Sequence, residues 1–122
     1  MVAAERMEHG MDWSVVDIGN GVTLVELSGR MDVSGALKAD PALAEIAADN
    51  SRVIVDLAKL DFLASLGIRS LVTTSKTLRG KNGNLVLLSP QPSVEQVLHS
   101  SGIDTIIPVA KNRADAEARV LA

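Results

Sequence analysis

The sequence predicts one α/β domain in which a mixed sheet of four to five strands packs against about four helices. The chain has 122 residues, which suits one hydrophobic core and is short for two. Apolar residues make up 47% of it and charged residues 22%, as in globular proteins. Runs of β-branched residues alternate with segments of helical spacing. That alternation indicates strands joined by helices that cover the sheet.

The first residues differ in character from the rest of the chain. Residues 1–11 contain Glu5 and Glu8 and lack the apolar stretch of a secretory signal. We therefore expect a flexible N-terminus over 1–11 and a folded domain over 12–122.

Two β-rich runs open the domain. They cover residues 13–18 and 22–27, and Gly-Asn-Gly separates them. A short turn of this composition between branched residues predicts a β-hairpin.

The next segment changes to helical spacing and is interrupted by Asp40-Pro41. Proline suits the first turn of a helix, and aspartate is a common N-cap. We therefore predict a short irregular or helical piece over 34–39 and a firmer helix over 41–49, with Asp40 as its cap.

A central strand and a long helix follow. "RVIVDL" at 52–57 is a continuous β-branched run, typical of a strand buried on both faces. From Leu66 to Arg79 the spacing is that of an amphipathic helix. Its inward positions are Ile68, Leu71, Val72, Ser75 and Leu78, and its outward positions are Arg69, Thr73, Lys76 and Arg79.

The last third repeats the strand–helix order. "LVLLSP" at 85–90 predicts a buried strand, and "SVEQVLHSSG" at 93–102 predicts a short helix capped by Ser93. "TIIPV" at 105–109 predicts a final strand, at an edge because proline lacks an N–H. Residues 113–122 predict a terminal helix.

Charge and composition exclude several classes of function. The formal net charge is −3 and no basic stripe is present, which argues against direct binding of nucleic acid or of an anionic membrane. The absence of cysteine excludes disulfides and thiolate catalysis. No window is long and apolar enough for a membrane span. We expect a soluble, cytoplasmic protein.

Residues suited to catalysis are isolated from one another. His9 and His99 belong to no ligand set of metal-site spacing, and we interpret Asp56 and Asp61 as loop caps or solvated turn residues. Neither a Gly-rich phosphate loop nor a nucleophile elbow around Ser65 is present. We therefore predict a protein that is not an enzyme and needs no cofactor or metal.

Ser65 has two interpretations. It precedes the long helix, so its hydroxyl could be an ordinary N-cap. A helix N-terminus also tolerates a phosphate, so the same hydroxyl could be a phosphorylation switch. Gly67 would let a partner approach the backbone, and Arg69, one turn on, could reach a phosphate. Leu63 and Leu66 would surround the hydroxyl with an apolar docking patch.

The stretch "VIVDLAKLDFLASLGIRSLV" at 53–72 resembles the signature of the STAS domain family. Three further stretches agree with that family in order: "GRMDVSGA" at 29–36, "NLVLLSP" at 84–90 and "VEQVLHSSGIDTIIPV" at 94–109. The resemblance covers roughly residues 12–121, and it lies in the order and spacing of these stretches rather than in any one of them.

The resemblance implies a stand-alone anti-sigma factor antagonist. Such a protein binds an anti-sigma factor, often a serine kinase of the histidine-kinase-like ATPase type, and so frees a sigma factor. Phosphorylation of a serine breaks that complex, and a metal-dependent serine phosphatase restores it. By position, Ser65 would be the phosphorylated residue and Asp32 an acidic residue near it. The implied partner-binding residues are Asp32, Leu63, Ala64, Ser65, Leu66, Gly67 and Arg69.

The chain departs from the family pattern beside Ser65. Ala64 stands where an aspartate is usual, which removes a like charge beside a phosphate. Leu66 stands where a serine or threonine is usual, which removes a polar contact. Two other functions stay open: a STAS scaffold or sensor subunit in which Ser65 is only a cap, and a nucleotide- or small-ligand-binding domain.

Overall fold

The computed structural model describes residues 10–122, which form a five-stranded mixed sheet with α-helices on both faces. The strand order is β1-β2-β3-β4-β5; β1 is antiparallel to β2, and the remaining pairs are parallel. Residues 1–9, with His9, lie outside the described residues. The strands are β1 (Met11–Asp17), β2 (Val22–Met31), β3 (Arg52–Leu63), β4 (Asn84–Leu88) and β5 (Val109–Ala110). The helices are α2 (Val33–Asp49), α3 (Ser65–Arg79), α4 (Pro92–Ser100), the 3-10 helix η1 (Ile103–Thr105) and α5 (Arg113–Leu121).

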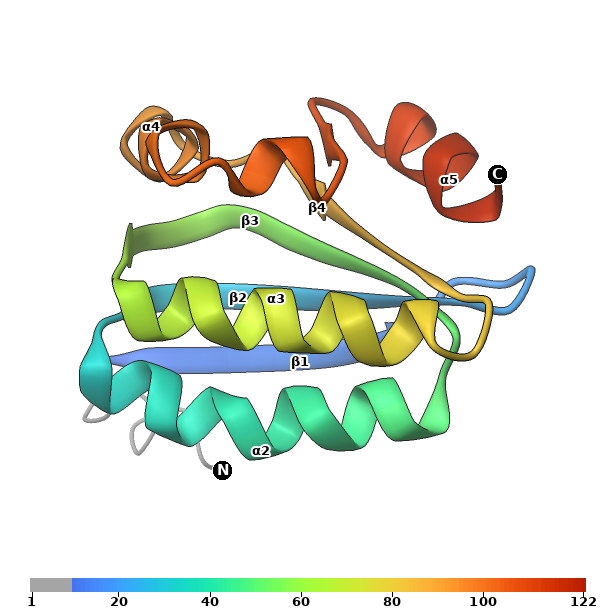
Figure 1. Ribbon diagram of the computed structural model, residues 1–122, viewed down its shortest axis with the longest axis horizontal. Helices are drawn as coiled ribbons and strands as arrows, with labels where there is room; N and C mark the ends of the chain where they lie inside the picture. Colours follow the sequence, from blue (N-terminus) through green and yellow to red (C-terminus); the bar gives the residue numbers. More distant parts are fainter. Residues whose placement is uncertain (1–9) are drawn as a thin grey trace.

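Two hydrophobic clusters lie on opposite faces of the sheet. Helices α2, α3 and α4 contribute to the larger one. Figure 1 shows α2 and α3 side by side; α2 contacts β1 and β2, and α3 contacts β3 and β4. Helix α5 covers the other face mainly near β3 and β4. The second cluster consists of Val22, Leu24, Ile54, Val86, Leu88, Ala110, Ala116 and Val120.

The hairpin and the central strand confirm two predictions. Strands β1 and β2 pair without interruption from Met11↔Gly29 to Asp17↔Thr23, around a turn in which Asn20 has φ 58°. Strand β3 lies in the middle of the sheet, and Val53, Ile54 and Val55 are fully buried, as a two-sided strand requires.

Strand β3 is longer than predicted. It continues to Leu63, so Asp56 and Asp61 are strand residues and our interpretation of them as loop residues was wrong. The pairing of β2 with β3 shifts register twice, between Glu26 and Ser28 and between Gly29 and Arg30. Such bulges interrupt the alternation by which a strand is recognised in a sequence.

Helix α2 is continuous through Pro41, so the predicted break at residue 40 was wrong. Pro41 lacks the N–H that would bond to the carbonyl of Leu37, yet buried side chains continue on both sides of it, including Ala39 and Leu43. Asp40 is inside the helix and caps nothing; its carboxylate accepts a hydrogen bond of 2.7 Å from the Ser70 hydroxyl of α3. Packing against α3 therefore holds the helix together across the proline.

Two predicted element boundaries in the C-terminal third were also wrong. Helix α4 begins at Pro92, with Gln91 as N-cap, so Ser93 is not its cap. Of the predicted last strand, residues 105–109, only Val109 pairs with β4; the strand continues to Ala110, and Thr105 belongs to η1 instead. β5 is nevertheless an edge strand that directly follows Pro108, as predicted. No helix among residues 10–122 is both long enough and apolar enough to span a membrane.

The turn between α3 and β4 yields a stability test. A Cβ added at Gly83 would fall on the Ser51 carbonyl oxygen, a backbone atom with little freedom to move. We expect Gly83→Ala to lower the free energy of unfolding by about 1–3 kcal/mol, the usual effect of overpacking. Urea denaturation measures it. Gly80→Ala is the control: Gly80 has helical φ −63° and only ordinary contacts, so it should be neutral or stabilising. Equal effects would contradict the assigned contact.

Candidate functional site

The candidate site lies where β2 and β3 end and the helices α2 and α3 begin. Met31 and Leu63 are register partners at the last positions of these two parallel strands. The Ala64 N–H donates to the Met31 carbonyl at 2.9 Å, which extends the pairing into the helix starts. Asp32 and Ser65 therefore come to the same edge of the sheet, and Figure 1 shows the two helices starting next to each other there. This edge is where α/β proteins commonly bind ligands.

Ser65 is the first residue of α3 and not its cap. The N-cap is Ala64, which has no side chain to accept a hydrogen bond. The first backbone bond of the helix runs from the Ile68 N–H to the Ala64 carbonyl at 3.0 Å. Ser65 is exposed, and its hydroxyl makes no hydrogen bond to any residue in the range 10–122. The interpretation of Ser65 as a capping residue was therefore wrong.

Asp32 has the capping role that Ser65 lacks. It is the N-cap of α2, and its Oδ1 accepts a hydrogen bond of 2.8 Å from the Gly35 N–H. The side chain is half-buried. The resemblance placed Asp32 near the serine, and the chain brings both residues to one edge, with the carboxylate directed to its own helix.

Two of the residues expected to contact a partner are instead buried. Leu63 is only 3% exposed, so its side chain belongs to the core and not to an exposed patch. Gly67 is buried too, and an added Cβ would lie 2.7 Å from Leu63 Cδ1 and 2.9 Å from Met31 Cγ. The missing side chain at Gly67 makes room for the core; it does not open the backbone to a partner, as we had expected.

The exposed apolar side chains near this edge are different ones. Val33 is 59% exposed, Leu37 64% and Phe62 40%. The Arg30 guanidinium lies over the Phe62 ring, 4.5 Å from its centroid. Sequence reasoning missed all four: the exposure of Arg30 and Phe62 depends on the β2–β3 register, and that of Val33 and Leu37 depends on which side of α2 packs against α3 and the sheet. The one available signal was that Phe62 is the only phenylalanine of the chain.

A groove of about 250 Å³ runs between α2 and α3 behind this edge. Leu66 and Arg69 line it from α3, and Leu37 and Asp40 line it from α2. Leu66 is half-buried and Arg69 is exposed, one helical turn after Ser65. Arg69 thus lies at the wall of the groove between α2 and α3.

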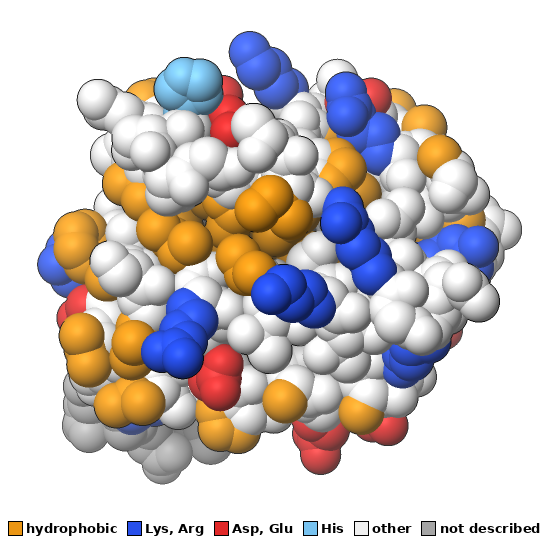
Figure 2. Space-filling model, in the orientation of Figure 1, with side chains coloured by type: hydrophobic (Ala, Val, Ile, Leu, Met, Phe, Trp, Pro, Cys, Tyr) orange, Lys and Arg blue, Asp and Glu red, His pale blue; other side chains and the backbone are white. Residues whose placement is uncertain are grey.

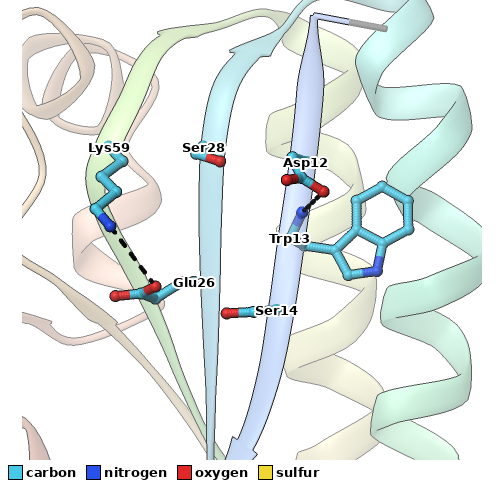
Figure 3. Close-up of a pocket in the computed structure, with 6 residues that line it drawn as sticks. All are labelled: Asp12, Trp13, Ser14, Glu26, Ser28 and Lys59. Atoms are coloured by element: carbon cyan, nitrogen blue, oxygen red, sulfur yellow. Dashed lines mark hydrogen bonds and ion pairs between the residues drawn. The ribbon is translucent and has the colours of Figure 1, made fainter. Parts of the chain in front are cut away.

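A second hollow, of about 440 Å³, lies on the uncovered face of β1, β2 and β3. Figure 3 shows Ser14, Ser28, Glu26 and Lys59 along the strands there, with Trp13 turned toward α2. Lys59 and Glu26 form a long, exposed ion pair of 4.0 Å, of a kind that contributes little to stability. This hollow is an ordinary solvated sheet face.

The side chains at this edge are not arranged for metal or acid–base chemistry within the part of the chain that the structure describes. Within residues 10–122 no group of three or more histidine, cysteine, aspartate or glutamate side chains is arranged to hold a metal. His99 is exposed and pairs with Asp104 at 2.9 Å, away from Ser65 in the sequence and on another helix. No side chain in the range 10–122 is bonded to Ser65 as a base that could activate its hydroxyl.

The STAS domain family model matches residues 14–116. The chain belongs to the STAS domain family. The match spans β1 through the first half of α5, and it confirms the family and the fold class expected from the sequence motifs.

Known relatives of this STAS domain are named as regulators. BtrV of Bordetella bronchiseptica, provisionally named an anti-sigma factor antagonist, is 34% identical over 100 residues, which cover 81% of this chain and 86% of BtrV. The anti-sigma-F factor antagonist RsfB of Mycobacterium tuberculosis is 26% identical, with 80% of each chain covered. The crystal structure of an anti-sigma factor antagonist from Mycobacterium paratuberculosis superposes with a TM-score of 0.83 at 27% identity, covering 92% of this chain and 95% of that one. All three names describe anti-sigma factor antagonists, and this agrees with our prediction that the chain is not an enzyme.

The cap of α2 can be tested separately from any binding role of Asp32. We expect Asp32→Ala to lower the free energy of unfolding by about 1 kcal/mol, because the Gly35 N–H loses its acceptor. Asp32→Asn keeps an acceptor oxygen and should cost much less. Thermal and urea unfolding compare the two variants. A loss as large in Asp32→Asn as in Asp32→Ala would show that the charge, not the cap, is what stabilises the helix.

Proposed function

We propose that this STAS domain is an anti-sigma factor antagonist whose binding is controlled by phosphorylation of Ser65. The observation that carries the proposal is the exposed Ser65 hydroxyl at the start of α3, unbonded to any residue among 10–122. A kinase can reach a hydroxyl of this kind without disturbing the fold. The names of the relatives support the antagonist role.

The unphosphorylated protein would bind through the edge formed by the two helix starts. Asp32, Ala64, Ser65, Leu66 and Arg69 are half-buried or exposed there. The exposed apolar side chains Val33, Leu37 and Phe62 extend the surface beyond them. In this proposal Leu63 and Gly67 do not contact the partner; they are buried and fix the position of the first turn of α3.

Phosphorylation would change the charge of this surface and not the fold. A phosphate adds about −1.5 to −2 charges next to apolar side chains that must be desolvated on binding. A charge mismatch of this kind costs several kcal/mol, and about 1.4 kcal/mol is tenfold in affinity. The N-terminus of α3 stabilises the phosphate within the free protein.

The proposed partner is an anti-sigma factor that is itself a serine kinase of the histidine-kinase-like ATPase type. Its capture by the unphosphorylated STAS domain would release a sigma factor, and a metal-dependent serine phosphatase would reset the cycle. All these steps would take place in the cytoplasm.

The first test compares two substitutions at Ser65. We expect Ser65→Ala to retain the anti-sigma kinase in a pull-down from the native host, and Ser65→Glu to bind at least about a hundredfold more weakly. Mass spectrometry identifies the bound proteins, and titration with the purified kinase gives the affinities. Ser93→Glu is the matched control, because Ser93 is an exposed serine in the first turn of another helix.

Equal retention of the same proteins by both Ser65 baits would contradict phosphorylation control. The STAS scaffold alternative would then be favoured, and it requires stable higher oligomers at micromolar concentration, which light scattering detects. Circular dichroism of Ser65→Glu should match the wild type; a changed spectrum would mean that lost binding reflects lost folding.

Arg69 should stabilise the phosphorylated form only. It is exposed one turn after Ser65, so its guanidinium can pair with a phosphate at the helix start. We expect Arg69→Ala to lower the Tm of Ser65-phosphorylated protein by the equivalent of about 0.2–1 kcal/mol, as for other exposed ion pairs. The Tm of unphosphorylated protein should be unchanged. Lys76→Ala, farther along the helix, is the control, and an unchanged Tm in phosphorylated Arg69→Ala would remove Arg69 from the proposed switch.

A further inference from the structure

A hydrophobic hollow lies between α3 and the α4–η1 segment, and it begins at Ile68, one helical turn after Ser65. Figure 2 shows apolar side chains gathered there, between the middle of α3 and the C-terminal helices. Ile68 and Val72 are on the side of α3 that also carries Arg79, at spacings of four and seven residues. The Arg79 side chain donates from Nη2 to the Ile106 carbonyl, just after η1, at 2.6 Å. That bond places this side of α3 against the segment after η1.

The side chains of the hollow are incompletely covered. Ile68, Val72 and Val97 pack against the main core but are only half-buried. Ile106 is 43% exposed, although the next residue, Ile107, is fully buried. Single exposed apolar residues are ordinary on a protein surface, but a contiguous group drawn from two helices and a loop marks an interaction site.

The charge on the α3 side of the hollow is positive, whereas α4 and η1 on its other side carry Glu95 and Asp104, and Asp104 is paired with His99. Helix α3 carries Arg69, Lys76 and Arg79 and contains no aspartate or glutamate, although the whole chain has a net charge of −3. Figure 2 shows lysine and arginine side chains beside the apolar hollow. The bond from Arg79 to the Ile106 carbonyl keeps one of these positive charges at its rim.

We propose that this hollow, lined by Ile68, Val72, Val97 and Ile106 and bordered by the cations of α3, docks an acidic amphipathic helix of a protein partner. Docking of this kind seats apolar residues at helical spacing in a groove between two elements. Acidic residues beside that stripe would face Lys76 and Arg79, which gives the groove an orientation and a preferred partner charge. Helix α3 has 15 residues, so it offers a track for a helix of about four turns.

Two other classes of partner fit the hollow less well. A nucleic acid would use the cations but leave the apolar floor unpaired, and three cations make a small basic footprint. A membrane surface binds a projecting apolar face rather than a hollow between helices. An acidic amphipathic helix fits better, because its apolar residues would contact the lining of the hollow and its acidic residues would pair with the cations of α3.

The proposal does not depend on the phosphorylation of Ser65, and its test uses defined probes. The first probe is a fluorescein-labelled peptide of about 16 residues with leucines along one helical face and glutamates beside them. The second has lysine in place of each glutamate. We expect saturable binding of the glutamate peptide by fluorescence anisotropy and at least about tenfold weaker binding of the lysine peptide. Amide chemical shift changes should fall on α3, α4 and η1.

Two variants and two matched controls locate the site. Ile106→Glu and Lys76→Glu should each lower the affinity for the glutamate peptide at least about fivefold. Val15→Glu places the same charge on an equally exposed apolar residue of β1, and Lys111→Glu reverses an exposed charge before α5; neither should change the affinity.

The proposal is overturned if the glutamate peptide does not saturate, if both peptides bind equally, or if the controls lower affinity as much as the site variants. Cosedimentation with phosphatidylserine vesicles, or binding of a single-stranded oligonucleotide that Ile106→Glu abolishes, would assign the surface to a membrane or a nucleic acid instead. If Ser65→Glu no longer binds the anti-sigma kinase but still binds the glutamate peptide, the hollow and the Ser65 edge are distinct binding surfaces.

Discussion

The pairing of β2 with β3 to their last residues is the interaction on which the candidate binding edge depends. Because Met31 and Leu63 are partners, the two strands end together, and the chain enters α2 and α3 from neighbouring positions. The Ala64 N–H and the Met31 carbonyl continue this pairing by one more bond. The Asp32 cap then fixes the direction of α2, and Gly67 packs the first turn of α3 onto Met31 and Leu63. Separate segments of sequence thus become one surface.

Much of this fold could be predicted from local signals, because the hairpin, the central β-branched run and the amphipathic spacing of α3 all act within short segments. The predictions were wrong for segments whose secondary structure is determined by contacts with residues distant in the sequence. Beyond Leu57 the buried residues of β3 are Leu60 and Leu63, a spacing of three that resembles neither strand nor helix, because two bulges in the pairing with β2 disturb the alternation. Similarly, Pro41 signals a break that the packing of α2 on α3 overrides.

At the site, the sequence could locate the serine but not its surroundings. The motif and the helical spacing placed Ser65 at the start of α3, yet the cap position shifted by one residue, and this leaves the hydroxyl exposed instead of bonded. Which apolar neighbours are exposed depends on the side of β3 that faces the core. Phe62 faces solvent under Arg30 while Leu63 faces the core, and no local pattern distinguishes these adjacent residues.

The packing of Gly67 also affects the rate at which a partner could associate with this edge. Its backbone is fitted against two buried side chains, so the first turn of α3 has no slack to reorganise when something docks on it. In the proposed function, a surface held in this way would need little reorganisation to bind a partner, and little conformational entropy would be lost on association. The proposed cycles of binding and release would then approximate the docking of rigid bodies, with rates set by encounter and surface charge rather than by folding.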